Sequence, residues 1–150
     1  MSHELNYFGN KNIIDCYKVG FLCSRKVPAE IILKTYDWAI VQREKGICVV
    51  SGFHSKIEKD VFHYLLKGTQ PIIMVLARNL MQRWPKEINK AVENGRLLIV
   101  SPLANKPVLI TKDTTYIRNK FILDNSDELF IPFHSPDGQI SKLLKENNKL

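Results

Sequence analysis

The sequence predicts an α/β protein with a doubly wound, mainly parallel sheet of about five strands and helices on both faces. Two observations predict this class. Short runs of Val, Ile and Leu are apolar at every position rather than at alternate ones, which is typical of strands buried on both faces. Segments with apolar residues at helical spacing lie between these runs, so strands and helices alternate along the chain.

The elements follow in order. Five strands are expected, over residues 19–23, 47–51, 72–76, 97–101 and 129–132. Helices are expected over residues 28–45, 56–67, 85–93 and 139–147. Pro28 suits a first helical turn because its φ is fixed, and Gly46 suits the position just past a helix end. Right-handed crossovers between such elements build a Rossmann-like sheet.

Length and composition limit the organisation of the chain. Its 150 residues, 45% of them hydrophobic, suffice for one α/β core. We therefore expect one domain over residues 1–150, with 1–17 as a lead-in segment and 145–150 as a frayed tail.

The three cysteines lack a C-x-x-C spacing, and no stretch resembles a signal peptide or a membrane helix of about 20 apolar residues. These features predict a cytoplasmic protein that has no membrane partner.

The charge balance favours polyanionic partners. Lys and Arg total 22 against 15 acidic residues, which gives a formal net charge of +7 and a pI near 9.4. Surplus lysines also serve only to solvate a surface, so the positions of the cations have to decide between the two interpretations. Cations follow four successive predicted strands: Arg25 and Lys26, then Lys56, then Arg78 and Arg83, then Lys106. Ligands of doubly wound sheets bind beyond the carboxyl ends of the strands, so this pattern predicts a phosphate-binding edge.

The corner after the first strand is suited to an anion. Ser24, Arg25 and Lys26 stand just before Pro28, where free backbone N–H groups and the helix dipole attract negative charge. Arg25 can grip a phosphate with two parallel hydrogen bonds. Two interpretations of Arg25 stay open, a phosphate contact or an ion pair with Glu58.

Patterns of catalysis are absent from the sequence. Neither G-x-x-x-x-G-K-[ST] nor G-x-G-x-x-G occurs, and the four histidines have no spacing typical of metal ligands. We therefore expect no cofactor, no metal and no catalytic residue, and a protein that binds its ligand rather than an enzyme.

Four segments together share their order and spacing with a known family. Residues 6–10 and 19–26 resemble the motifs L-Y-x-x-G-N and V-x-x-V-G-S-R-K-P, residues 49–58 resemble V-V-S-G-x-A-x-G-I-D, and residues 118–122 resemble R-N-R-I-I. These are motifs of the DNA-processing protein A (DprA) family, related to the nucleotide-binding Lonely Guy proteins. The chain departs from them at Lys56, where the family has glycine, at Glu58, where it has aspartate, and at Lys120, where it has arginine.

The resemblance implies a module that binds single-stranded DNA through backbone phosphates, pairs into a homodimer and passes the DNA to RecA during natural transformation or recombination. The implied phosphate contacts are Ser24, Arg25, Lys26, Ser51, Gly52, Lys56, Arg118, Asn119 and Lys120. Tyr116 is expected to stack on a base. An alternative stays open: a nucleotide-binding sensor or a nucleotide-processing hydrolase that uses the same phosphate pocket. Residues 132–139 lack the glycine-rich G-G-x-G-T-x-x-E loop of the Lonely Guy hydrolases.

Overall fold

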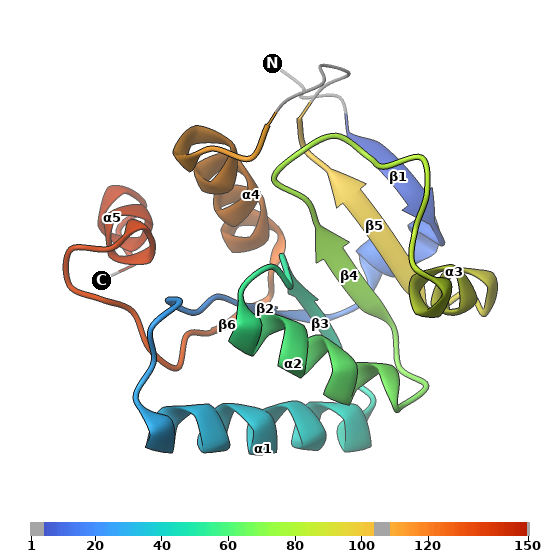
Figure 1. Ribbon diagram of the computed structural model, residues 1–150, viewed down its shortest axis with the longest axis horizontal. Helices are drawn as coiled ribbons and strands as arrows, with labels where there is room; N and C mark the ends of the chain where they lie inside the picture. Colours follow the sequence, from blue (N-terminus) through green and yellow to red (C-terminus); the bar gives the residue numbers. More distant parts are fainter. Residues whose placement is uncertain (1–4, 104–108, 150) are drawn as a thin grey trace.

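One sheet organises the computed structural model, which describes residues 5–103 and 109–149. Its six strands lie in the order β1-β5-β4-β3-β2-β6 (Figure 1). The strands are β1 (Asn6–Gly9), β2 (Lys18–Phe21), β3 (Cys48–Ser51), β4 (Ile72–Val75), β5 (Leu97–Ser101) and β6 (Glu128–Phe130). β1 pairs antiparallel with β5, and the other neighbouring strands pair in parallel. The predicted fold class, a mainly parallel Rossmann-like sheet, is confirmed.

Helices cover both faces of the sheet (Figure 1). They are α1 (Ala29–Lys45), α2 (Lys56–Leu66), α3 (Lys86–Glu93), α4 (Lys112–Asn125), α5 (Gln139–Glu146) and a short 3-10 helix, η1 (Lys11–Asp15). Core residues of α1, α2 and α3 pack on one face, whereas those of η1, α4 and α5 pack on the other. None of the described helices is long and apolar enough to cross a membrane.

Consecutive strand residues enter opposite layers of the core, as the period of two in a strand requires. Val49 packs with the layer of α1, α2 and α3, and its neighbour Val50 packs with the layer of α4 and α5. Ile72 and Ile73 divide in the same way. Because both faces are covered, the strands need apolar residues at every position, which is the pattern seen in the sequence.

Three elements were not expected from the sequence: the short helix η1, β1 and α4. β1 is a partly exposed edge strand with Tyr7 and Phe8 between Asn6 and Gly9, so it lacks the run of Val, Ile and Leu that marks the other strands. α4 turns polar residues toward the core, with Thr114, Arg118 and Asn119 buried beside Ile122 and Leu123. A helix that buries polar side chains lacks the apolar stripe by which helices are recognised in a sequence.

Backbone hydrogen bonds continue past the end of α5 in the part of the chain that the structure describes. α5 ends at Glu146, and the N–H of Lys149 donates to the carbonyl of Leu144 at 2.8 Å.

The direction in which successive strands are added to the sheet reverses at β2. From β2 the chain adds β3, β4 and β5 on one side, and β6 then returns to the opposite side of β2. Right-handed crossovers place the connecting helices on opposite faces when the direction reverses, so a crevice opens beyond the carboxyl ends of β2 and β6. The loop after β2, which carries Arg25, lies at this crevice.

Candidate functional site

A cavity of about 610 Å³ occupies the crevice beyond β2. Its walls come from the loop after β2, the segment before α2, the first turns of α4 and α5, and the loop after β6. The lining residues are Leu22, Cys23, Ser24, Arg25, Lys26, His54, Ser55, Glu58, Ile110, Thr111, Lys112, Thr115, Arg118, Asn119, Ser135, Gly138, Gln139 and Ile140. Four of these described side chains are cationic and one is a carboxylate, so the cavity favours an anionic ligand.

Three cations at the cavity are exposed and unpaired. Arg25, Lys26 and Lys112 make no hydrogen bond or ion pair with any residue that the structure describes. The alternative interpretation of Arg25, an ion pair with Glu58, is therefore not seen in the described structure. All three side chains keep their donors available for a ligand.

Arg118 is the buried cation of the cavity. Only 7% of the residue is exposed, and its Nε donates to Oδ1 of Asn119 at 2.7 Å. Within residues 5–103 and 109–149, its two terminal nitrogens have no hydrogen-bond partner. Burial lowers the pKa of Arg118, the negative charge of Glu58 opposes that shift, and Arg25 adds to it. The guanidinium still keeps its charge, because arginine does not deprotonate in proteins.

Gly52 makes room for this guanidinium. A Cβ atom at position 52 would lie 2.0 Å from Nη1 of Arg118 and 2.6 Å from its Cζ. Any side chain there would push the guanidinium away. Gly52 therefore forms the surface against which Arg118 packs, although Gly52 itself does not line the cavity.

The backbone before α2 forms an anion cradle that a side chain of the protein fills. Phe53 has a left-handed φ of 48°, and after it the N–H groups of His54 and Ser55 donate to Oε1 of Glu58 at 2.9 and 3.0 Å. The side chain of Ser55 in turn accepts from the N–H of Glu58 at 3.4 Å, which completes a capping box. Successive N–H groups near a left-handed residue make a nest for an anion, and here the anion is Glu58.

His54 lies at the cavity, and its surroundings lower the pKa of its ring. Partial burial lowers its pKa below 6.5, and the positive charges of Arg118, Lys59 and Arg25 lower it further, whereas Glu58 opposes them. The ring is therefore uncharged at neutral pH, and it is sensitive to any anion that enters the cavity.

Five of the residues implied by the sequence meet at the cavity: Ser24, Arg25, Lys26, Arg118 and Asn119. Ser24 ties two loops together, because its Oγ accepts from the N–H of Ser135 at 3.0 Å. Ser51 is fully buried, with its Oγ 3.4 Å from the donating N–H of Phe53. Ser51 thus shapes the turn behind the cavity rather than its surface.

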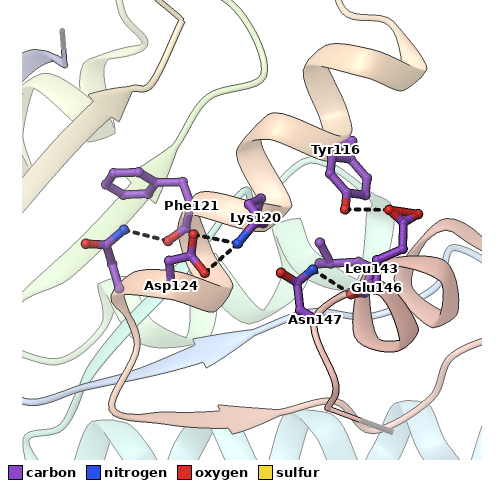
Figure 2. A network of polar contacts seen from close by, with 8 residues as sticks. Tyr116, Lys120, Phe121, Asp124, Leu143, Glu146 and Asn147 are labelled. Atoms are coloured by element: carbon purple, nitrogen blue, oxygen red, sulfur yellow. Dashed lines mark hydrogen bonds and ion pairs between the residues drawn. The ribbon is translucent and has the colours of Figure 1, made fainter. Parts of the chain in front are cut away.

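The other three implied residues are Lys56, Lys120 and Tyr116. They lie outside the described cavity lining, and each interacts with an acidic side chain. Nζ of Lys56 lies 2.8 Å from Asp60, one helical turn along α2. Lys120 forms the equivalent pair with Asp124 at 2.9 Å, and the hydroxyl of Tyr116 donates to Glu146 at 3.0 Å (Figure 2). Tyr116 thereby joins α4 to α5.

Sequence reasoning missed Lys112 and Thr111, because both belong to the start of the unexpected helix α4. Thr111 accepts from the N–H of Thr114 at 3.1 Å, so it caps the helix that carries Arg118. Arg78 is not among the cavity residues, and Arg83 lines a separate hollow beside Trp84. Lys106 lies outside the described residues. In the described part of the chain, no group of three or more His, Cys, Asp or Glu side chains is placed to hold a metal ion.

Comparison with solved structures identifies the fold. No family model and no curated protein matches the sequence. DNA processing protein A from Helicobacter pylori, a protein reported with a single-stranded DNA binding mode, is similar with a TM-score of 0.76 and 22% identity. DNA processing protein A (DprA) from Streptococcus pneumoniae is similar with a TM-score of 0.72 and 19% identity. The chain has the fold of DprA.

The similarity to DprA covers nearly all of this chain and only part of the two solved proteins. The match spans 97% of this chain and 68% of the Helicobacter protein, and 95% of this chain and 52% of the Streptococcus protein. Within this DprA fold, three of the four segments with DprA-like motifs reach the cavity, and residues 6–10 do not line it. Residues 19–26 supply Ser24 and Arg25, residues 49–58 supply Glu58, and residues 118–122 supply Arg118 and Asn119.

Proposed function

We propose that this chain binds single-stranded DNA through backbone phosphates in the cavity beyond β2. One observation carries the proposal. Arg118 is buried at the cavity, and its terminal nitrogens have no partner among the described residues. These nitrogens are not among the described buried polar atoms that lack a partner, so they stay open to the cavity. A phosphate entering the cavity can accept their unused N–H groups from a guanidinium whose side chain is already held in place by burial.

The exposed cations extend the same site. Arg25 lines the cavity as a second side chain capable of bidentate donation, while Lys26 and Lys112 add positive charge to the lining. A strand passing over the cavity places one phosphate against Arg118 and its neighbouring phosphates near these exposed side chains. The fold shared with a DprA that is reported to bind single-stranded DNA supports this choice of ligand.

Salt dependence tests the proposal directly. We expect labelled single-stranded oligonucleotides to bind more tightly as their length increases, and the affinity to fall steeply with salt, measured by fluorescence anisotropy. Each phosphate contact contributes about −0.7 to the slope of log affinity against log salt. Arg25→Ala should therefore reduce the slope by about that amount.

Lys56→Ala is the matched control, because it also removes an exposed cation, but one paired with Asp60 outside the cavity lining. Its slope should stay at the wild-type value. Equal slopes for wild type and Arg25→Ala would remove Arg25 from the site. Binding of a mononucleotide with no gain from oligonucleotide length would favour the nucleotide sensor or hydrolase instead.

The finer predictions from the resemblance extend this proposal. A homodimer would lengthen the cationic surface, and transfer of the strand to RecA would place the protein in transformation or recombination. Light scattering tests the first, and release of labelled DNA from a preformed complex on addition of RecA tests the second. A reducing cytoplasm suits the buried thiols of Cys23 and Cys48, each of which has its pKa raised by burial to about 12.

A further inference from the structure

The cavity contains a built-in negative charge. Glu58 is the only acidic residue among the described cavity lining, and the residue is 7% exposed. Its charge acts on the cation Arg118 and on the neutral ring of His54. A carboxylate in a site for anions weakens the binding of every anion, so the position of Glu58 needs an explanation.

Glu58 removes one set of phosphate donors from the site. The N–H groups of His54 and Ser55 would otherwise be available at the start of α2, and both donate to its Oε1. A second phosphate close to the one on Arg118 would therefore find a carboxylate instead of free donors. The remaining donors are spread over Arg25, Lys26 and Lys112, which suits phosphates that are spaced along a strand.

Coulomb repulsion by Glu58 scales with the charge that a ligand brings next to it. An internal phosphodiester carries one negative charge. A terminal phosphomonoester carries about −1.5 to −2 at pH 7, and a polyphosphate concentrates more charge in the same volume. Repulsion by a fixed carboxylate thus penalises terminal phosphates and polyphosphates more than phosphodiesters.

We propose that Glu58 is a specificity-determining residue that makes the cavity select internal phosphodiesters over terminal phosphates and nucleoside polyphosphates. This inference rests on the proposed binding of single-stranded DNA and names the feature of the ligand that the site reads. It also separates a DNA-binding module from a sensor of free nucleotides that uses the same pocket.

Glu58→Gln is the test variant, because glutamine also completes a capping box and its carbonyl oxygen can accept both N–H groups. Asp60→Asn is the matched control. It removes a carboxylate from the same helix, but Asp60 interacts with Lys56 and Tyr36 outside the cavity lining.

Two ligands with equal numbers of phosphorus atoms make the comparison: a thymidine tetranucleotide without a terminal phosphate, and ATP. If removing the charge of Glu58 strengthens binding about threefold for each ligand charge near it, the phosphodiester gains about threefold and a doubly charged phosphate about tenfold. Calorimetry or competition against a labelled oligonucleotide measures both affinities. Asp60→Asn should leave the ratio of the two affinities unchanged.

Equal gains for the two ligands in Glu58→Gln, or no gain for either, would overturn the inference while DNA binding by the wild type still upheld the proposed function. The wild type gives an independent measurement should the variant fold poorly. It should bind the tetranucleotide more tightly than ATP, although ATP carries more charge. Tighter binding of ATP would contradict the inference, and absence of oligonucleotide binding at low salt would instead overturn the proposed function itself.

Discussion

Residues 118–120 belong to one short motif, yet they lie on two faces of α4 with different surroundings. Arg118 and Asn119 face the cavity, where both are buried and Arg118 keeps two nitrogens without a described partner. Lys120 lies outside the cavity lining and pairs with Asp124 one helical turn away, while Tyr116 donates to Glu146 of α5 (Figure 2). Residues two apart on a helix do not share a face, so the cations of one motif enter two environments.

We therefore expect a cation of this chain to bind DNA when it lies at the cavity with unused donors, whatever its place in a motif. An exposed pair one helical turn apart is worth only a few tenths of a kcal/mol and fixes little. The guanidinium of Arg118 is held in place by burial, and its unused donors open into the cavity, so it can bind an anion without first losing another partner.

The largest effect is expected from removing Arg118, the cation on the cavity side of α4. Arg118→Ala should weaken binding of single-stranded DNA by roughly 10- to 150-fold, because hydrogen bonds to charged groups contribute about 1.5–3 kcal/mol. Lys120→Ala should stay within about twofold of wild type, since its pair with Asp124 lies outside the cavity lining. Anisotropy titrations measure both, and circular dichroism checks that each variant is folded. Similar losses in the two variants would end the distinction between the faces.

A smaller effect is expected from filling the space behind Arg118. Gly52→Ala should destabilise the protein by about 1–3 kcal/mol, because the added Cβ would lie 2.0 Å from Nη1 of Arg118. Urea unfolding measures this loss. The same substitution in an Arg118→Ala background should cost much less, since the clashing atoms are gone. Additive losses in the double variant would show that Gly52 matters for another reason.

The smallest effect concerns the pH dependence of DNA binding, through His54 at the cavity. Burial, then the charges of Arg118, Lys59 and Arg25, hold the pKa of His54 below its usual 6.5, so its folded-state contribution to stability is present above that pH and declines as the pH falls below it. A bound phosphate raises this pKa, so binding takes up a proton. DNA affinity should therefore rise severalfold between pH 7.5 and 5.5.

His54→Gln should remove most of this pH dependence of DNA binding. His63→Gln should retain it, because His63 pairs with Glu87 and does not line the cavity. Binding that is independent of pH in the wild type would place the phosphate away from His54.

The sequence predicted most of the scaffold for a simple reason. Strands buried on two faces need unbroken apolar runs, and helices that close crossovers need an apolar stripe and an end signal, so β2 to β6 and four of the helices left local patterns. β1 escaped prediction because Asn6 and Gly9 flank Tyr7 and Phe8 and leave no run of Val, Ile and Leu. α4 escaped because its core face includes Arg118 and Asn119, and burying polar groups for a binding site erases the stripe.

The candidate site divides in a similar way. Local sequence is enough to indicate that cations follow the carboxyl ends of the strands, and that the corner at Arg25 is suited to an anion. The folded chain is needed to see that Arg118 packs against Gly52, that Glu58 fills the cradle before α2, and that Lys56 and Lys120 pair outside the cavity lining. The reason is that strand and helix patterns depend on neighbours along the chain, whereas burial and pairing of a charge depend on groups that folding brings together from distant segments.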